Sequence, residues 1–261
     1  MNQQFGVCNL SLVPLRAEPS DKSEIYSQLL FGDHFTILET SGKWIRLITA
    51  YDGYEGWLDH KQFAEIDQVA FVGLHDLNAV LGLSISHRVI KTAVNESLNL
   101  LAGTNIPLIE NNCFYIDDIE YRLDGNAVKP SKENFNRDIA DAAMFYLNTP
   151  YLWGGRSAFG IDCSGFSQMV FKQFGIRLKR DAWQQAGQGE PVDFLQEAKA
   201  GDLAFFDNEE GRITHVGIML NSSQIIHSSG RVKIEAIDNQ GIYSTELNGY
   251  THKLRIIKRF A

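Results

Sequence analysis

Residues 151–175 read Y-L-W-G-G-R-S-A-F-G-I-D-C-S-G-F-S-Q-M-V-F-K-Q-F-G, and this stretch decides the fold of the C-terminal half of the chain. Three glycines lead into Asp162-Cys163-Ser164, after which apolar residues recur at helical spacing as far as Gly175. The pattern predicts a buried helix with Cys163 in its first turn. Because the unpaired amides of a first turn favour an anion, we expect the Cys163 thiol to tend toward the reactive thiolate.

Two histidines further along the chain are candidates for the groups that a cysteine nucleophile needs. His215 lies in an alternating segment that predicts a strand, and His227 ends the next short apolar run. A nucleophilic thiol requires a base within hydrogen-bond reach and a third polar group that orients the base. Taken singly, each histidine is equally consistent with a half-buried strand residue, and Cys163 with a small apolar core residue.

Five segments, in this order, carry a specific resemblance: P-Y-L-W-G-G-R-S, G-I-D-C-S-G-F, A-G-D-L-A-F-F, T-H-V-G-I and I-I-H-S-S-G. Together they resemble the NlpC/P60 family of papain-like cysteine peptidases over residues 134–261. The resemblance implies that Cys163 is the nucleophile, His215 the general base and His227 the orienting third residue. Members of that family cut bacterial cell-wall peptides, commonly between the γ-carboxyl of D-glutamate and an L-diamino acid, either meso-diaminopimelate or L-Lys.

Composition limits the other classes of function. The chain has 261 residues, 44% of them hydrophobic, which is enough for two or three small domains. A net charge of −8 without a basic run argues against a nucleic-acid surface. Cysteines 8, 113 and 163 are odd in number and far apart, which argues against a disulfide framework and a four-ligand zinc site. We therefore expect no metal and no cofactor.

The first ten residues, M-N-Q-Q-F-G-V-C-N-L, lack the basic and apolar regions of a secretion signal. No later segment approaches the roughly 18 apolar residues of a membrane span. We expect a cytoplasmic protein without a membrane or an obligate protein partner. A cell-wall peptidase in that compartment would meet recycled murein tripeptides and tetrapeptides as substrates.

Three regions follow from the strand and helix patterns. Short strands with turn residues predict a small β-barrel over residues 1–73, and the order P-L-R, S-Q-L-L-F-G-D, W-I-R-L, G-Y-E-G-W-L resembles bacterial SH3-like domains. Residues 74–130 predict either a second, degenerate SH3-like barrel or an elaborated linker. In residues 131–261, Ser131 can cap a helix with one apolar stripe, and a strand-rich half follows. The expected fold is α+β, with a papain-like catalytic domain after one or two barrels.

The family resemblance also implies a substrate-binding set. In similar cytoplasmic enzymes the barrel closes one end of the cleft, so that only peptides with a free N-terminal L-alanine fit. By position, Asp181, Glu24 and Tyr54 would bind the ammonium group, and Asp162 and Ser164 would line the same subsite. Each has a structural alternative: Asp181 as a helix cap, Glu24 as a solvated loop charge and Tyr54 as barrel packing.

Three functions remain open from the sequence alone. The first, which the three reactive residue types favour, is a cysteine endopeptidase acting on γ-D-glutamyl bonds. The second is a cell-wall-binding module with an inert papain-like domain. The third is an amidase or acyltransferase on another substrate, because one fold can host several chemistries.

Overall fold

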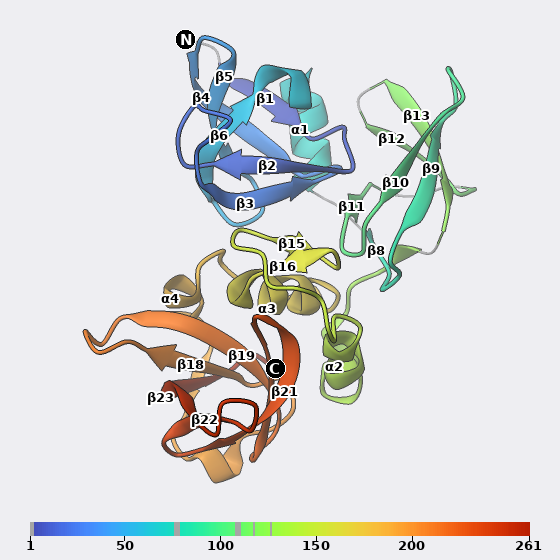
Figure 1. Ribbon diagram of the computed structural model, residues 1–261. Helices are drawn as coiled ribbons and strands as arrows, with labels where there is room; N and C mark the ends of the chain where they lie inside the picture. Colours follow the sequence, from blue (N-terminus) through green and yellow to red (C-terminus); the bar gives the residue numbers. More distant parts are fainter. Residues whose placement is uncertain (1–2, 76–78, 108–110, 117, 126) are drawn as a thin grey trace. The chain divides into compact units, whose positions relative to one another are not determined.

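The computed structural model describes residues 3–75, 79–107, 111–116, 118–125 and 127–261. It divides into two compact units, Met1–Pro130 and Ser131–Ala261 (Figure 1). Among the described residues, no helix is long and apolar enough to cross a membrane.

The first unit begins with an antiparallel sheet in the strand order β3-β2-β6-β5-β4-β1-β7. The segment W-I-R-L-I-T forms β5, and its side chains alternate between core and surface beyond Ile45, as the sequence predicts. Leu15, Leu47 and Leu58 meet at 0% exposure inside this SH3-like barrel. The strands are β1 (Gln4–Val7), β2 (Leu12–Arg16), β3 (Ile25–Leu30), β4 (His34–Ser41), β5 (Trp44–Thr49), β6 (Glu55–Asp59) and β7 (Ala64–Ile66).

Residues 74–130, for which the sequence left a degenerate barrel or a linker open, form two small sheets. Their strand orders are β10-β9-β13-β12 and β11-β8-β14. Several of these strands have only two or three residues, so their local pattern is weak. Helix α1 (Gln68–His75) precedes these sheets, whose strands are β8 (Ala79–Leu81), β9 (His87–Lys91), β10 (Glu96–Leu100), β11 (Asn105–Ile106), β12 (Cys113–Ile116), β13 (Ile119–Asp124) and β14 (Ala127–Val128).

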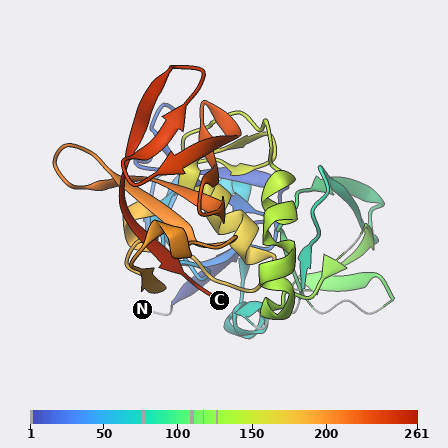
Figure 2. The same ribbon diagram turned by 90° about the horizontal axis from the view of Figure 1, so that it is seen from below.

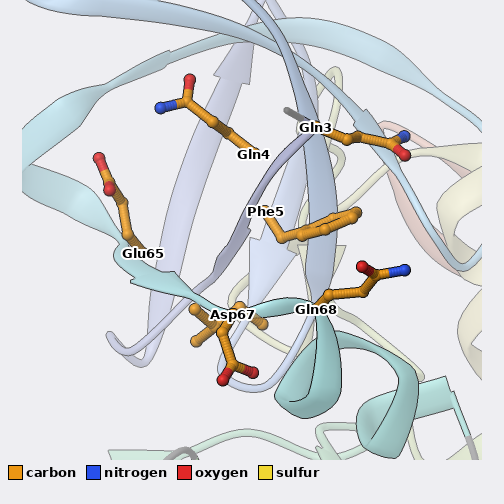
Figure 3. Close-up of a pocket in the computed structure, with 7 residues that line it drawn as sticks. Gln3, Gln4, Phe5, Glu65, Asp67 and Gln68 are labelled. Atoms are coloured by element: carbon orange, nitrogen blue, oxygen red, sulfur yellow. The ribbon is translucent and has the colours of Figure 1, made fainter. Parts of the chain in front are cut away.

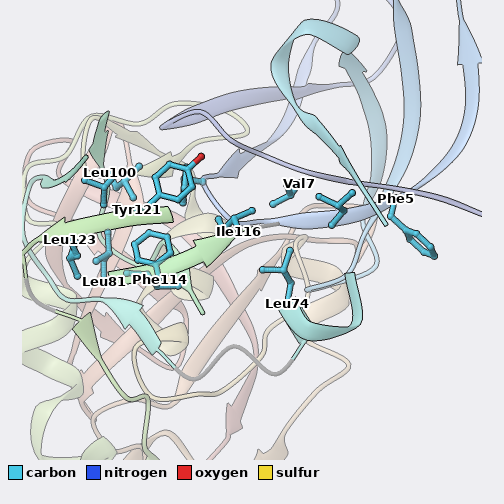
Figure 4. Close-up of a cluster of buried hydrophobic side chains, with 13 residues drawn as sticks. Phe5, Val7, Leu74, Leu81, Leu100, Phe114, Ile116, Tyr121 and Leu123 are labelled. Atoms are coloured by element: carbon cyan, nitrogen blue, oxygen red, sulfur yellow. The ribbon is translucent and has the colours of Figure 1, made fainter. Parts of the chain in front are cut away.

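One hydrophobic cluster joins these small sheets to the barrel within the first unit (Figure 4). Phe31 packs edge-on against Phe114 and Tyr121, with ring centroids 6.2 and 5.2 Å apart. Val7 and Leu123 belong to the same buried cluster. The second part of the unit is therefore held to the barrel by apolar side chains, whose burial is the main favourable term in folding.

A cavity of about 410 Å³ lies at the corner between β1, β7 and the start of α1 (Figure 3). Its polar lining includes Gln4, Glu65 and Gln68, and Asp67 accepts a hydrogen bond from the Ala70 amide at 2.8 Å. No cysteine, histidine or serine belongs to the lining that the structure describes. The cavity therefore lacks the groups of a nucleophilic site.

The second unit starts with helices and continues as an antiparallel sheet, which confirms the predicted α+β class. The sheet order is β17-β23-β18-β19-β20-β21-β22, and β23 also pairs with β22. Its elements are η2 (Lys132–Asn134), α2 (Phe135–Met144), β15 (Arg156–Ser157), β16 (Gly160–Ile161), α3 (Cys163–Lys172), α4 (Ala182–Gln185), β17 (Glu190–Val192), η3 (Leu195–Glu197), β18 (Leu203–Asp207), β19 (Ile213–Asn221), β20 (Gln224–Ser229), β21 (Arg231–Asp238), β22 (Gly241–Ser244) and β23 (Gly249–Arg259).

Helix α3 is buried on every side, since it packs against β19 and β20 on the sheet and against α2 (Figure 2). The stripe predicted for α2 is confirmed, because Phe135, Ile139, Ala142 and Ala143 are all buried. Phe135 meets Phe171 of α3 edge-on at 5.3 Å. The predicted stop is also confirmed, because α3 ends before Gly175, which adopts a φ of 72°.

Candidate active site

Cys163 is the first residue of α3, and the cap that starts this helix is Asp162. The Asp162 carboxylate accepts a hydrogen bond from the Gly165 amide at 2.6 Å, which satisfies one of the unpaired donors of the first turn. Gly165 is needed there, because an added Cβ would collide with the carbonyl oxygen of Gly155. The glycine residues before Cys163 and in the first turn thus let the preceding loop lie against the start of α3.

A buried ion pair holds the residues on either side of the thiol. Arg180, 1% exposed, donates from both terminal nitrogens to the two carboxylate oxygens of Asp162, at 3.1 and 2.6 Å. The same guanidinium donates to the hydroxyl of Ser164 at 2.9 Å. The Gly154 amide also donates to Asp162, at 2.8 Å. Cys163 therefore lies between two side chains that the protein itself fixes.

Sequence patterns do not single out Arg180, because the segment R-L-K-R-D contains no feature that separates it from its basic neighbours. Its role depends on the fold, which brings a residue 18 positions from Asp162 into the buried cluster. Asp162 and Ser164, expected to line a substrate subsite, are 5% and 6% exposed. Their hydrogen bonds to Arg180 are internal to the protein, and a contact of either residue with substrate stays a prediction.

The two predicted histidines lie on neighbouring strands. His215 is in β19 and His227 in β20, where His227 is paired with Gly217. The His215 Nε2 and His227 Nδ1 atoms are 2.9 Å apart. Gly217 leaves room for this contact, since an added Cβ would lie 2.9 Å from the His227 Cβ. The strand register thus positions one imidazole against the other.

The Cys163 thiol lies against the strand that carries His215. The backbone amide of Val216, the residue after His215, lies close enough to the thiol to lower its pKa, and so does that of Ser164. Since Nε2 of His215 faces His227, Nδ1 is the ring nitrogen left for the thiol proton. In the second unit the thiol thus lies against the strand of His215, and His215 contacts His227.

The expectation that the resting thiol tends toward thiolate was wrong. Burial and the Asp162 carboxylate raise the pKa of Cys163 to about 12, although hydrogen bonds from Val216 and Ser164 and the charge of Arg180 act in the opposite direction. Burial, together with the nearby His227, His252 and Lys233, holds the pKa of His215 well below its usual value of 6.5. Desolvation disfavours both charged forms, so the resting pair is a neutral thiol and a neutral imidazole.

Two residues that the sequence analysis missed complete the surroundings of the histidines. Glu235 of β21 lies with its Oε2 2.9 Å from Nε2 of His227. His252 of β23 stacks on His215, with ring centroids 4.1 Å apart and an interplanar angle of 27°. Neither stands in a recognisable motif, because each reaches the site only through the pairing of the strands.

His215, His227 and His252 also raise the question of a metal, since their ring nitrogens lie within 4.8 Å of one another. An imidazole coordinates a metal through a lone pair in the plane of its ring. The nearly parallel rings of His215 and His252 cannot direct such lone pairs at one ion, and His215 already shares a proton with His227. The three rings therefore fit a metal site poorly.

Comparison with known proteins agrees with the motifs. Residues 148–250 match the NlpC/P60 family, and residues 15–63 match the bacterial dipeptidyl-peptidase SH3 domain. The protein named gamma-D-glutamyl-L-lysine dipeptidyl-peptidase from Bacillus subtilis is 33% identical over 85% of this chain and 79% of its own length. The chain belongs to the NlpC/P60 family. A Bacillus cereus protein of the same name is 28% identical over 80% of this chain and 68% of its own length.

Solved structures give the same architecture for this NlpC/P60 protein. A crystal structure of an NlpC/P60 family protein from Bacillus cereus has a TM-score of 0.82 at 21% identity, covering 98% of this chain and 99% of that chain. An NlpC/P60 endopeptidase from Photobacterium damselae has a TM-score of 0.73 at 17% identity, covering 97% and 70%. At these identities the likeness concerns the fold, and it confirms the expected papain-like domain with SH3-like barrel.

Of the remaining substrate-binding candidates, Asp181 belongs to the second unit, and Tyr54 and Glu24 belong to the first. Asp181 is the N-cap of α4 and forms a capping box with Gln184. The side-chain oxygen of Gln184 accepts a hydrogen bond from the Asp181 amide at 3.1 Å. Tyr54, half-buried before β6, meets Tyr26 edge-on at 6.4 Å, and Glu24 is exposed before β3. Contact of these residues with an NlpC/P60 substrate remains a prediction from the resemblance.

Proposed function

We propose that this protein is a cysteine endopeptidase that hydrolyses the bond between the γ-carboxyl of D-glutamate and an L-diamino acid in murein peptides. The carrying observation is the thiol of Cys163 beside the strand of His215, which is hydrogen-bonded to His227. Relatives that match most of the chain are named for a dipeptidyl-peptidase activity on γ-D-glutamyl-L-lysine, which supports this substrate class.

The chemistry follows from the protonation states at rest. Because Cys163 is a neutral thiol and His215 a neutral imidazole, His215 takes the proton as the sulfur attacks the scissile carbonyl carbon. The C–N bond then breaks, and His215 returns the proton to the leaving amine of the diamino acid. Water, activated by the same histidine, hydrolyses the thioester and releases the D-glutamyl carboxylate.

The negative charge of the tetrahedral intermediate needs donors that are already oriented. The amide of Cys163, at the start of α3, is the proposed donor from the main chain. Donors at a helix start carry partial positive charge and need no reorganisation when the oxyanion forms. His227 acts in the same cycle by orienting the His215 ring.

We further propose that the substrate carries a free N-terminal L-alanine, as in murein tripeptides and tetrapeptides recycled in the cytoplasm. By the family resemblance, Asp181, Glu24 and Tyr54 are the proposed partners of its ammonium group. A buried ammonium needs carboxylate partners, and an N-acylated peptide has no such charge to offer. The enzyme would then reject intact wall stems, in which this nitrogen is acylated.

Two peptides test the proposal directly. L-Ala-γ-D-Glu-L-Lys, or its meso-diaminopimelate counterpart, is expected to give the dipeptide L-Ala-D-Glu, whereas the N-acetylated peptide is expected to react orders of magnitude more slowly. Comparable rates on both would contradict the free-amine requirement. If neither peptide is cleaved, the proposed activity is contradicted.

The substitution Asp181→Asn probes the ammonium site. Removing one carboxylate from a buried charge pair is expected to lower kcat/KM for the free-amine peptide by about 2–4 kcal/mol of transition-state binding. The matched control is Asp193→Asn, which changes an exposed aspartate of the same unit. Equal rates in the two variants would remove Asp181 from the site.

A further inference from the structure

The hydrogen-bonded chain that begins at the catalytic base continues beyond His227 to a carboxylate. The His215 Nε2 to His227 Nδ1 distance is 2.9 Å, and the His227 Nε2 to Glu235 Oε2 distance is also 2.9 Å. The three residues lie on the consecutive strands β19, β20 and β21, and His227 is 0% exposed. Nε2 of His215 and both ring nitrogens of His227 thus each have a protein partner, so their proton positions are linked.

Glu235 is held as an acceptor. Lys233, whose ammonium group can only donate, lies 3.1 Å from the second carboxylate oxygen. Burial raises the pKa of Glu235, but hydrogen bonds from His227, Ser244 and Lys233 outweigh this effect and lower it to about 2. The group is therefore an ionised carboxylate at any pH at which the enzyme works.

An ionised carboxylate fixes the proton positions of both rings. Since Glu235 can only accept, Nε2 of His227 must carry the proton between them. Burial lowers the pKa of His227, which keeps its ring neutral and leaves a lone pair on Nδ1. His215 must then donate to that lone pair from its own Nε2. Its Nδ1 is left unprotonated, which is the form that can accept a proton from Cys163.

We propose that Glu235 is a positioning residue of the catalytic centre, which sets the tautomers of His227 and His215 so that the lone pair of the base is available to the thiol. The proposal rests on the proposed function for the roles of Cys163 and His215, while the tautomers are a property of the folded protein. The opposite tautomers would place a proton on Nδ1 of His215 and leave the thiol without a base.

The substitution Glu235→Gln is expected to reverse the donor and acceptor roles along the hydrogen bonds from residue 235 to His215. Lys233 still donates, and the single carbonyl oxygen of the amide is its acceptor, so the amide NH₂ faces His227. It then donates to Nε2, and the proton of His227 moves to Nδ1. An aspartate-to-asparagine change beside a catalytic histidine lowers kcat by about 10⁴ through the same error of tautomer. We expect a loss of at least about 100-fold here.

Proton uptake by the histidine pair also depends on this carboxylate. Glu235 is faced by His227 from β20, Lys233 from its own strand and Ser244 from β22, with His215 and His252 on β19 and β23 close by. The negative charge favours the protonated pair, so its removal makes protonation harder. The acid limb of kcat/KM is expected to move to lower pH by at least about 0.5 units in Glu235→Gln.

Nitrogen-15 NMR of the histidine rings reads the tautomers without any turnover. In the Cys163→Ala background, Nε2 is expected to carry the proton on both His215 and His227, and Glu235→Gln is expected to move it to Nδ1. An Nδ1 proton on His227 in the parent protein would overturn the proposal even if the glutamine variant failed to fold. Unchanged tautomers in a folded variant would do the same.

Kinetics supply the second readout. Glu246 is the matched control, because it is a second carboxylate near Lys233, at 3.9 Å, and it is half exposed. On L-Ala-γ-D-Glu-L-Lys, Glu246→Gln is expected to change kcat/KM by less than about 2-fold and Glu235→Gln by at least about 100-fold; near-equal values would refute the inference. If the parent enzyme does not cleave this peptide, the proposed substrate is wrong. The rate of iodoacetamide alkylation of Cys163 then tests the inference, because Glu235→Gln is still expected to differ from the parent far more than Glu246→Gln does.

Discussion

The buried ion pair beside the nucleophile makes a quantitative prediction. Arg180→Met would remove a guanidinium that forms two hydrogen bonds with Asp162 and one with Ser164. Methionine fills much of the same volume, so the change mainly deletes charge and donors. Asp162 would keep the amides of Gly154 and Gly165 but lose its only ion-pair partner among those described.

The expected cost follows from burial. Arg180 and Asp162 have side-chain exposures of 1% and 8%, so solvent cannot replace the lost partner. Breaking a buried pair from one side costs about 3–5 kcal/mol. In a unit of the size of residues 131–261, 1 kcal/mol corresponds to about 4 °C, so the melting temperature should fall by roughly 10–20 °C.

Calorimetry of the full chain measures this loss, and Arg137→Met is the control. Arg137 pairs with Asp138 on the surface, with side-chain exposures of 72% and 40%, so its loss should cost less than about 1 kcal/mol. The double variant Arg180→Met, Asp162→Asn should recover part of the loss, since the Asp162 charge is then removed together with its partner. A cost below about 1 kcal/mol for Arg180→Met alone would refute the reasoning.

Three further predictions concern the thiol and the histidines. Cys163→Ala should abolish hydrolysis in a peptide assay without unfolding the protein, and more than a few per cent of residual activity would exclude Cys163 as nucleophile. His227→Gln should retain some activity where His215→Ala retains almost none, because a neutral amide can still accept the imidazole N–H; full activity in the His227 variant would remove it from the site. The pKa values of His215, His227 and His252 are lowered in the folded protein, so the unfolded chain takes up protons first as the pH falls below 6.5. Urea unfolding should therefore show a free energy of unfolding that decreases by about 1.4 kcal/mol per pH unit for each histidine. A flat profile from pH 7 to 5 would contradict the burial of neutral rings.

The sequence predicted the elements that local patterns specify. The helix that begins at Cys163 and stops before Gly175 follows from apolar spacing and from a glycine with a positive φ, and both signals act within a few residues. His215 was placed on a strand by alternation and His227 by a short apolar run, and the structure confirms both strands. Such features depend on short-range periodicity and on backbone preferences of single residue types.

The remaining features depend on long-range packing. The Cys163 thiol was expected to tend toward thiolate because the helix start is visible in the sequence, whereas the burial that raises its pKa is not. Glu235 and His252 reach the histidines only through the register of β21 and β23 in the finished sheet. The short strands of residues 74–130 gave no clear periodicity for the same reason, since their order comes from the shared hydrophobic cluster.

Hydrolysis of L-Ala-γ-D-Glu-L-Lys in water enriched in oxygen-18, followed by mass spectrometry, tests the central claim most directly. Attack by Cys163 on the γ-carbonyl and hydrolysis of the thioester predict one heavy oxygen in the released L-Ala-D-Glu and none in the lysine, with no product from Cys163→Ala. Cleavage between alanine and glutamate, or label in the lysine, would contradict the account.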